Sequence, residues 1–271
     1  MQKTHILLIH GTWCNGNNWG DFATELGQRG FIVHTPTLRH HGAPSESDSL
    51  ANAAKVCKVG LLDYVSDLIA LIDTMDSPPI VIGHSLGTLI AQLVAVRRPT
   101  QGLVLLGPAP AAGMFGMYPS MFLLWGRYVP QWLARKPMQP VSWQPWVQKV
   151  CNKQPYHLQK SYYDTLCAES GTVYFEMALW FLDRKKAAKV DFDAIKSPVL
   201  IITGSEDKCT VPQIGRAVAQ KFGDQATYVE LQGSDHMMTM GHYMPQTLAT
   251  IDNWLADHCL CKETIRAKIF L

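Results

Sequence analysis

The chain has 271 residues, of which 47% are hydrophobic and 17% are charged, so it can bury a full core as one α/β domain with or without an insertion. Its formal net charge of +2 comes from dispersed Lys and Arg, which favours a small-molecule partner over nucleic acid or an anionic membrane surface. No apolar segment reaches the roughly 20 residues of a membrane helix, and the apolar stretch at 5–10 is too short for a signal-peptide core. We therefore expect a cytoplasmic protein without stable membrane insertion.

Short apolar runs typical of buried parallel strands occur in the outer thirds of the chain. They cover residues 5–10, 31–37, 79–84, 102–107, 198–204 and 227–233. Amphipathic, helix-like stretches lie at about 17–29, 60–75, 87–98, 212–222 and 245–258. Strand followed by helix, repeated along the chain, predicts an α/β fold with a doubly wound, mostly parallel sheet.

The middle of the chain breaks this alternation. Eight of the sixteen prolines fall between Pro108 and Pro155, and Trp and Met residues are concentrated there. We predict a helical cap at 111–190 over a core formed by 1–110 and 191–258, followed by a tail at 259–271 to which we assign no role. Most of the apolar cap side chains are expected to hold the cap together, and a few to line a pocket against the core. The pocket candidates are Trp13, Met114, Met117, Trp125 and Met237.

The seven cysteines are odd in number and scattered, which is typical of reduced thiols rather than of a disulfide framework. Only Cys259 and Cys261 lie close together. A structural metal site formed by these two cysteines and His258 would need further ligands, because such a site has four. We therefore expect no metal and no cofactor.

The pentapeptide Gly83-His84-Ser85-Leu86-Gly87 lies where a predicted strand ends and a helix begins. A serine on so tight a turn takes a strained conformation, and larger residues two positions before and after it would collide with the neighbouring strand and helix. The turn lifts the hydroxyl clear of the sheet and places the amide of Leu86 at a helix N-terminus. We predict that Ser85 is a nucleophile rather than an ordinary turn residue.

A serine hydroxyl needs a base to take its proton, and the chain has ten histidines. His236 follows the last predicted strand, in a loop that opens at the same sheet edge as the predicted nucleophile. We therefore predict that His236 is the base. His40 and His41 lie in a polar loop and are expected at the surface, whereas His10 and His84 are expected to orient backbone around the site.

An imidazole that acts as a base needs a hydrogen-bond acceptor on its other nitrogen. Glu206 and Asp207 closely follow the strand predicted at 198–204. We predict that Asp207 is this acceptor, that Glu206 faces solvent, and that Asp235 is a turn or capping residue. The chain order serine, aspartate, histidine is typical of one triad architecture among several unrelated ones.

A second donor for a developing oxyanion is expected from the loop after the first strand, HGTWCNGNNW. Gly11 allows the backbone of this loop to approach a ligand closely. The amide of Thr12 is then predicted to point, together with that of Leu86, at the substrate oxygen.

These segments resemble the α/β-hydrolase fold over nearly the whole chain except the cap and the tail. The stretch at 5–38 together with GHSLG, GSEDK and GSDHMMTM resembles the branch of plant methyl-ester hydrolases and hydroxynitrile lyases. The resemblance implies a nucleophile at Ser85, an acid at Asp207 and a base at His236. It also implies that the amides of Thr12 and Leu86 form the oxyanion hole.

Departures from this branch indicate the reaction. In the branch, lyases carry a hydroxyl side chain and a lysine where this chain has Gly11 and Met237, which favours ester hydrolysis. Dehalogenases and epoxide hydrolases of the same fold use an aspartate nucleophile, so Ser85 argues against both. We expect a serine hydrolase for a small-molecule carboxylic ester with an apolar acyl or alcohol group. The alternatives are a thioesterase, lactonase or acyltransferase with the same triad, or a non-catalytic small-molecule binding protein on this fold.

Overall fold

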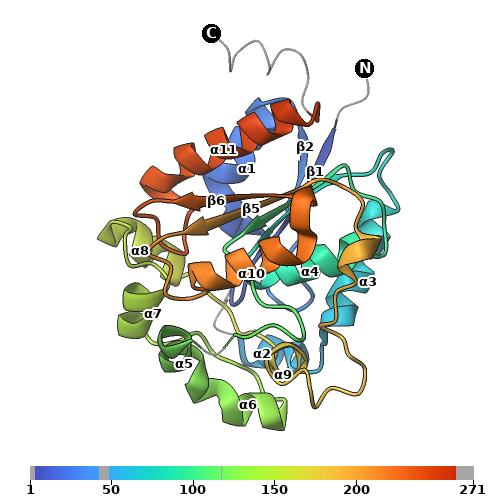
Figure 1. The fold of residues 1–271 in the computed structure, drawn as a ribbon. Helices are drawn as coiled ribbons and strands as arrows, with labels where there is room; N and C mark the ends of the chain where they lie inside the picture. Colours follow the sequence, from blue (N-terminus) through green and yellow to red (C-terminus); the bar gives the residue numbers. More distant parts are fainter. Residues whose placement is uncertain (1–3, 43–48, 117, 261–271) are drawn as a thin grey trace.

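Six parallel strands form one sheet in the order β2-β1-β3-β4-β5-β6 in the computed structural model, which describes residues 4–42, 49–116 and 118–260 (Figure 1). Met117 and positions 261–271 of the predicted tail lie outside the described residues. The strands are β1 (His5–Ile9), β2 (Ile32–His34), β3 (Ile80–His84), β4 (Gly102–Leu106), β5 (Val199–Gly204) and β6 (Ala226–Leu231). Every pair of neighbours in this sheet is parallel, which confirms the predicted α/β fold class.

Helices cover both faces of the sheet. On one face, Leu8 and Ile82 pack with residues of α1 (Gly20–Gln28) and α11 (Met244–Asp257). On the other face, Leu7 and Val81 pack with apolar residues of three helices, which are α3 (Leu61–Ile72), α4 (Leu86–Ala95) and α10 (Pro212–Phe222). All residues of β1, β3, β4 and β5 are buried, as expected for central strands covered on both sides. The short helix α2 (Ser49–Val56) was not predicted.

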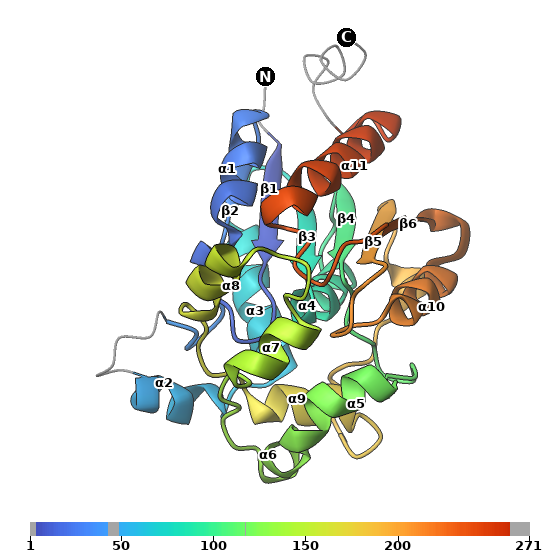
Figure 2. The same ribbon diagram turned by 90° about the vertical axis from the view of Figure 1, so that its left-hand side faces the viewer.

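Helices also make up the cap. Within 111–190 the structure has α5 (Pro119–Trp125), α6 (Val129–Ala134), α7 (Trp143–Lys149), α8 (Tyr156–Tyr163) and α9 (Gly171–Ala178). Several prolines stand at or just before the first turn of these helices, where their missing N–H costs nothing. Figures 1 and 2 show α5, α6, α7 and α9 beyond the carboxyl ends of the strands. The cap therefore covers the sheet edge at which the predicted site residues lie.

Among the described residues, no helix is long and apolar enough to cross a membrane. The same residues contain no group of three or more His, Cys, Asp or Glu side chains arranged to hold a metal ion. The six cysteines that the structure describes are free thiols.

Candidate active site

Ser85 stands at the turn between β3 and α4 with φ of +55° and ψ of −123°. A positive φ is costly for a residue other than glycine, and such strain persists only where the surroundings enforce it. A Cβ atom on Gly83 would lie 2.4 Å from the Gly87 carbonyl oxygen, and one on Gly87 would lie 2.1 Å from that of Ile9. The strand and helix therefore approach so closely that only glycine fits two residues before and after Ser85.

The loop after β1 lies directly against this turn. A Cβ atom on Gly11 would come within 2.9 Å of the Ser85 Cβ atom. Among the described residues, the backbone N–H groups of Thr12 and Leu86 donate no hydrogen bond within the protein, and the N–H of Leu86 opens helix α4. Both predicted oxyanion donors are therefore free to bind an acceptor on a ligand.

His236 and Asp207 form a buried pair. Asp207 lies three residues after β5 and His236 five residues after β6, and His236 Nδ1 donates a hydrogen bond to Asp207 Oδ2 over 2.7 Å. The other carboxylate oxygen of Asp207 accepts from the backbone N–H groups of Cys209 and Thr210, at 2.8 and 2.9 Å. Asp207 is thus held as an acceptor, which leaves His236 Nε2 as the unprotonated nitrogen of the neutral ring. The carboxylate of Glu206 is 44% exposed, as expected.

Two residues around this pair escaped the sequence analysis. The hydroxyl of Thr210 lies 3.0 Å from the Gly107 carbonyl oxygen and 3.1 Å from Asp207 Oδ2. Gly107 has φ of +54°, and a Cβ atom there would lie 3.0 Å from His236 Nδ1. A threonine three residues after an aspartate in a turn is a weak signal for Thr210, and nothing in the sequence singles out Gly107.

The electrostatics of the two neighbouring histidines differ. Burial disfavours charge on His236, but the carboxylate of Asp207 and the neighbouring Cys209 together outweigh it and hold the pKa of His236 well above its usual value. Burial, together with His236, lowers the pKa of His84 to about 3. His84 Nε2 donates to the His236 carbonyl oxygen over 2.9 Å, which confirms that His84 orients backbone at the site.

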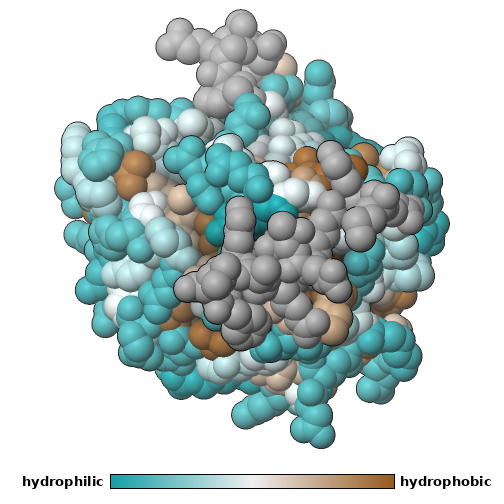
Figure 3. All heavy atoms as spheres, turned by 90° about the horizontal axis from the view of Figure 1, so that it is seen from above, coloured by the Kyte–Doolittle hydropathy of each residue, from teal (hydrophilic) through white to brown (hydrophobic). Residues whose placement is uncertain are grey.

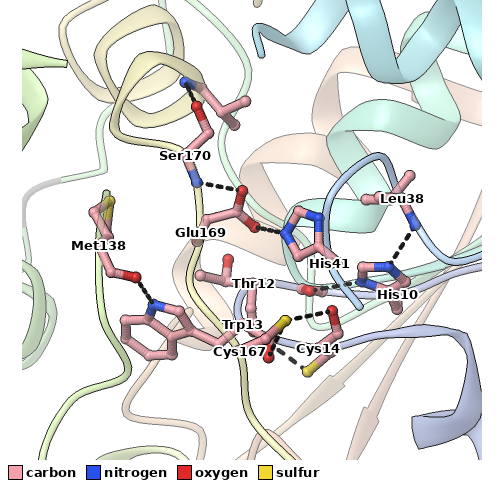
Figure 4. A network of polar contacts seen from close by, with 12 residues as sticks. His10, Thr12, Trp13, Cys14, Leu38, His41, Met138, Cys167, Glu169 and Ser170 are labelled. Carbon is pink, nitrogen blue, oxygen red and sulfur yellow. Dashed lines mark hydrogen bonds and ion pairs between the residues drawn. The ribbon is translucent and has the colours of Figure 1, made fainter. Parts of the chain in front are cut away.

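His10 has the same kind of role. Its Nδ1 atom donates to the carbonyl oxygen of Gly11 over 3.0 Å, and its Nε2 atom accepts from the N–H of Leu38 over 3.0 Å (Figure 4). Burial and the nearby His41 lower the pKa of His10 to about 3. The neutral imidazole therefore fixes the start of the loop that carries Thr12.

The surface position expected for His41 is wrong, although His40 beside it is exposed. The His41 ring is completely buried, and its Nε2 atom lies 3.1 Å from Glu169 Oε2 (Figure 4). Glu169 also accepts from Tyr64 Oη and the Ser170 N–H, at 3.1 and 2.7 Å. The partner of His41 comes from the cap, 128 residues away, so the polar loop sequence gave no sign of it.

Cap residues hold the loop after β1. The N–H of Cys167 donates to the Trp13 carbonyl oxygen over 2.7 Å, and Trp13 Nε1 donates to the Met138 carbonyl oxygen over 3.1 Å (Figure 4). The hydroxyl of Thr12 lies 2.7 Å from that of Tyr174 in α9. The position of the Thr12 amide therefore depends on the cap as well as on β1.

Asp235 also connects the core to the cap. Its carboxylate accepts from the N–H of Met237 over 3.0 Å, as expected of a turn residue, and from the N–H of Lys153 over 2.7 Å. Lys153 lies between α7 and α8. The loop that carries His236 is therefore fastened to the cap on one side and to Asp207 on the other.

A cavity of about 400 Å³ extends from Ser85 to the surface between core and cap. Met114 and Trp125, two of the predicted pocket residues, line it, together with Met121, Trp132 and Met177. The predicted residues Trp13 and Met237 line a smaller void of about 20 Å³, which Ser85 and His236 also border. Met117 lies outside the described residues. Ser85 thus borders both the apolar cavity and the small void that the His236 side chain lines.

A model of the alpha/beta hydrolase family matches residues 6–251. The chain belongs to this family. Among curated relatives, the lipase LipV of Mycobacterium tuberculosis is 36% identical over 110 residues, which cover 39% of this chain and 38% of the lipase.

Two solved structures illustrate the likeness in fold. The monoacylglycerol lipase of Paleococcus ferrophilus superposes with a TM-score of 0.68 at 22% identity, covering 94% of this chain and 96% of the lipase. The methylesterase MES16 of Arabidopsis gives a TM-score of 0.66 at 13% identity, covering 92% of this chain and 97% of its own. At these identities the likeness is one of fold.

Proposed function

We propose that this protein is a cofactor-independent serine hydrolase that cleaves a carboxylic ester with an apolar acyl or alcohol group. The observation that carries the proposal is the position of Ser85. It stands on a strained turn at the base of an apolar cavity, and it shares a small void with His236, which is paired with the buried Asp207. The relatives named as lipases and as a methylesterase agree with ester chemistry.

In the proposed reaction, His236 Nε2 takes the hydroxyl proton as Ser85 Oγ attacks the acyl carbonyl carbon. The carbonyl oxygen becomes an oxyanion, which the amides of Thr12 and Leu86 stabilise by hydrogen bonds. The imidazolium of His236 then protonates the leaving alkoxide, and an acyl ester on Ser85 remains. Water, deprotonated by His236, attacks this ester and releases the carboxylic acid while the proton returns to Ser85.

Asp207 stabilises the imidazolium in each half of this reaction. Its carboxylate accepts from His236 Nδ1 and is itself held by the N–H groups of Cys209 and Thr210. The ring is therefore fixed in the tautomer that leaves Nε2 unprotonated before attack.

The cavity supports an apolar substrate. Its volume of about 400 Å³ falls within the roughly 300–1,000 Å³ of small-molecule sites. Its walls include Met114, Met121, Trp125 and Met177, and each methylene group buried there stabilises the complex by roughly 0.8 kcal/mol. Thioesters and lactones present the same carbonyl to Ser85, so they are the nearest alternative substrates.

The test is hydrolysis of p-nitrophenyl esters from acetate to palmitate by the wild type and by Ser85→Ala and His236→Ala variants. We expect turnover by the wild type and a loss of about 10³-fold or more in kcat for each variant. His242→Ala is the matched control, because His242 is an exposed histidine six residues beyond His236. A folded wild type that hydrolyses none of these esters and does not react with a fluorophosphonate probe contradicts the proposal and favours a binding protein.

A further inference from the structure

Exposed apolar side chains are concentrated on the cap. Among the described residues, nine large hydrophobic residues are exposed, and eight of them belong to 111–190. They are Phe115, Phe122, Leu123, Leu133, Tyr156, Trp180, Phe181 and Leu182; the ninth is Leu62 on α3. Exposed apolar residues scattered singly need no explanation, whereas a concentration of them marks an interaction surface.

Part of this surface surrounds the opening of the cavity. Phe115, Trp180 and Phe181 are exposed and also line the cavity that reaches Ser85; we call these three residues the rim. Phe115 is 65% exposed and Phe181 is 64% exposed. The rim therefore forms a continuous apolar path from solvent to the proposed nucleophile.

The cap is also strongly basic. Residues 111–190 contain ten Lys and Arg against four Asp and Glu, a net charge of +6, whereas the whole chain carries +2. The carboxylates of Glu169, Glu176 and Asp183 are buried, and that of Asp164 pairs with Lys160. The net positive charge of the chain is thus concentrated in the cap, although its basic residues are dispersed along the sequence.

Three of these basic residues follow the rim after Leu182 and Asp183. Arg184, Lys185 and Lys186 are exposed, and none of the ion pairs among the described residues involves them. The face at the opposite end of the molecule differs, because hydrophilic residues dominate it and hydrophobic ones form small separate spots (Figure 3). Among the described residues, every exposed Phe, Trp and Tyr side chain belongs to the cap.

We infer that the cap docks on an anionic lipid surface, with the rim buried at the level of the headgroups and Arg184, Lys185 and Lys186 against the lipid phosphates. Aromatic and aliphatic side chains gain free energy from burial at the headgroup boundary, and adjacent basic residues add electrostatic attraction. Docking in this orientation places the opening of the cavity on the lipid. An apolar substrate then reaches Ser85 without crossing water.

The chemistry of the surface favours lipid over an acidic protein. Trp180, Phe181 and Leu182 are consecutive exposed residues in a segment outside the helices and strands, so they can enter a fluid interface without matching a fixed shape. Lys185 and Lys186 have long, flexible side chains without an ion-pair partner among the described residues, so their ammonium groups can bind lipid phosphates that have no fixed arrangement.

The test is co-sedimentation of the full chain, as Ser85→Ala, with phosphatidylcholine vesicles and with vesicles that also contain phosphatidylglycerol. Using this variant separates binding from ester hydrolysis, so the result stands whether or not the proposed reaction is correct. We expect binding to the anionic vesicles that weakens with salt. The change Lys185→Gln with Lys186→Gln should weaken it at least about tenfold, given about fivefold for each basic residue. Phe181→Ser should weaken binding to both kinds of vesicle.

Two changes outside the cap serve as matched controls. Lys221→Gln removes an exposed lysine of α10, and Leu62→Ala removes the exposed leucine of α3; neither should alter vesicle binding. The Lys185 and Lys186 double variant should keep the wild-type unfolding temperature and the wild-type rate on a soluble short-chain ester. A wild type that stays in solution with both vesicles, or controls that weaken binding equally, overturns the inference. Salt-sensitive binding to polyglutamate but not to vesicles also overturns it and indicates an acidic protein partner.

Discussion

The hydroxyl groups of Thr12 and Tyr174 lie 2.7 Å apart and join the loop after β1 to helix α9 of the cap. Tyr174 also lines the large cavity, where its ring lies 5.2 Å from that of Trp125 and 5.6 Å from that of Trp132. One residue therefore shapes the wall of the cavity and holds the backbone that carries a proposed oxyanion donor.

Replacing Tyr174 by Phe should lower kcat more than it changes KM. The change keeps the ring but removes the hydroxyl that fixes Thr12, so the Thr12 amide is less well placed for the transition state. A hydrogen bond contributes about 1 kcal/mol net, which corresponds to a fall in kcat of about fivefold. Tyr163→Phe is the control, because its hydroxyl donates to the Val141 carbonyl oxygen inside the cap. Equal effects of the two changes on kcat would contradict the positioning role.

Replacing Asp207 by Asn should change both the rate and its dependence on pH. The reaction needs neutral His236, so kcat/KM rises as pH increases through the pKa of His236, and Asp207 places that pKa above its ordinary value. Without the carboxylate, the midpoint of this rise should move to lower pH and kcat should fall by about 10⁴-fold. The pH profiles of both proteins on one p-nitrophenyl ester provide the measurement. An unchanged midpoint would mean that Asp207 does not set the pKa of His236.

Replacing Gly107 by Ala should impair turnover through His236. The new Cβ atom would lie 3.0 Å from His236 Nδ1, at a backbone position with φ of +54°, so the ring must move from its place beside Asp207. Gly30→Ala is a matched control, since Gly30 has φ of +88° and no atom within 4 Å of the added Cβ. We expect both variants to lose about 1 kcal/mol of stability from backbone strain. Only Gly107→Ala should lose kcat, and equal activity of the two variants would refute this account.

Removing His10 should make the stability of the fold less sensitive to acid. His10 has a pKa of about 3 in the folded protein and about 6.5 when unfolded. Between these values the unfolded chain binds the extra proton, so the free energy of unfolding decreases as pH falls. At pH 5 this lowers the free energy of unfolding of the wild type by about 2 kcal/mol. A His10→Asn variant does not have this loss. Urea unfolding of both proteins at about pH 7 and pH 5 measures the difference, and parallel losses would contradict it.

The strand positions could be predicted from sequence because each depends on a local pattern. The run at 79–84 became β3 (Ile80–His84), and the stretch at 245–258 became α11 (Met244–Asp257). The tight turn at Ser85 could likewise be predicted from the spacing of Gly83 and Gly87. The Ser49–Val56 helix was missed because it is only eight residues long and rich in alanine.

Contacts between distant parts of the chain could not be predicted in this way. His41 lies in a polar loop, and its buried position depends on Glu169. Glu169 belongs to the cap, and the sequence alone does not show how the cap packs on this loop. Thr12 contacts Tyr174 across 162 residues of the sequence, and Gly107 lies next to His236 although 129 residues separate them. A single sequence carries no signal for such pairs, because they follow from how the cap and the loops pack.

Strand β1 begins, and helix α11 finishes, at the end of the molecule opposite α5, α6 and α9 (Figure 1). This follows from the parallel sheet, since β1 starts at the edge farthest from the cap and α11 runs back to it. A protein attached to a solid support through either of these ends would turn its cavity toward the bulk liquid. The topology of the sheet thus makes the chain suitable for oriented immobilisation without any change to the cap.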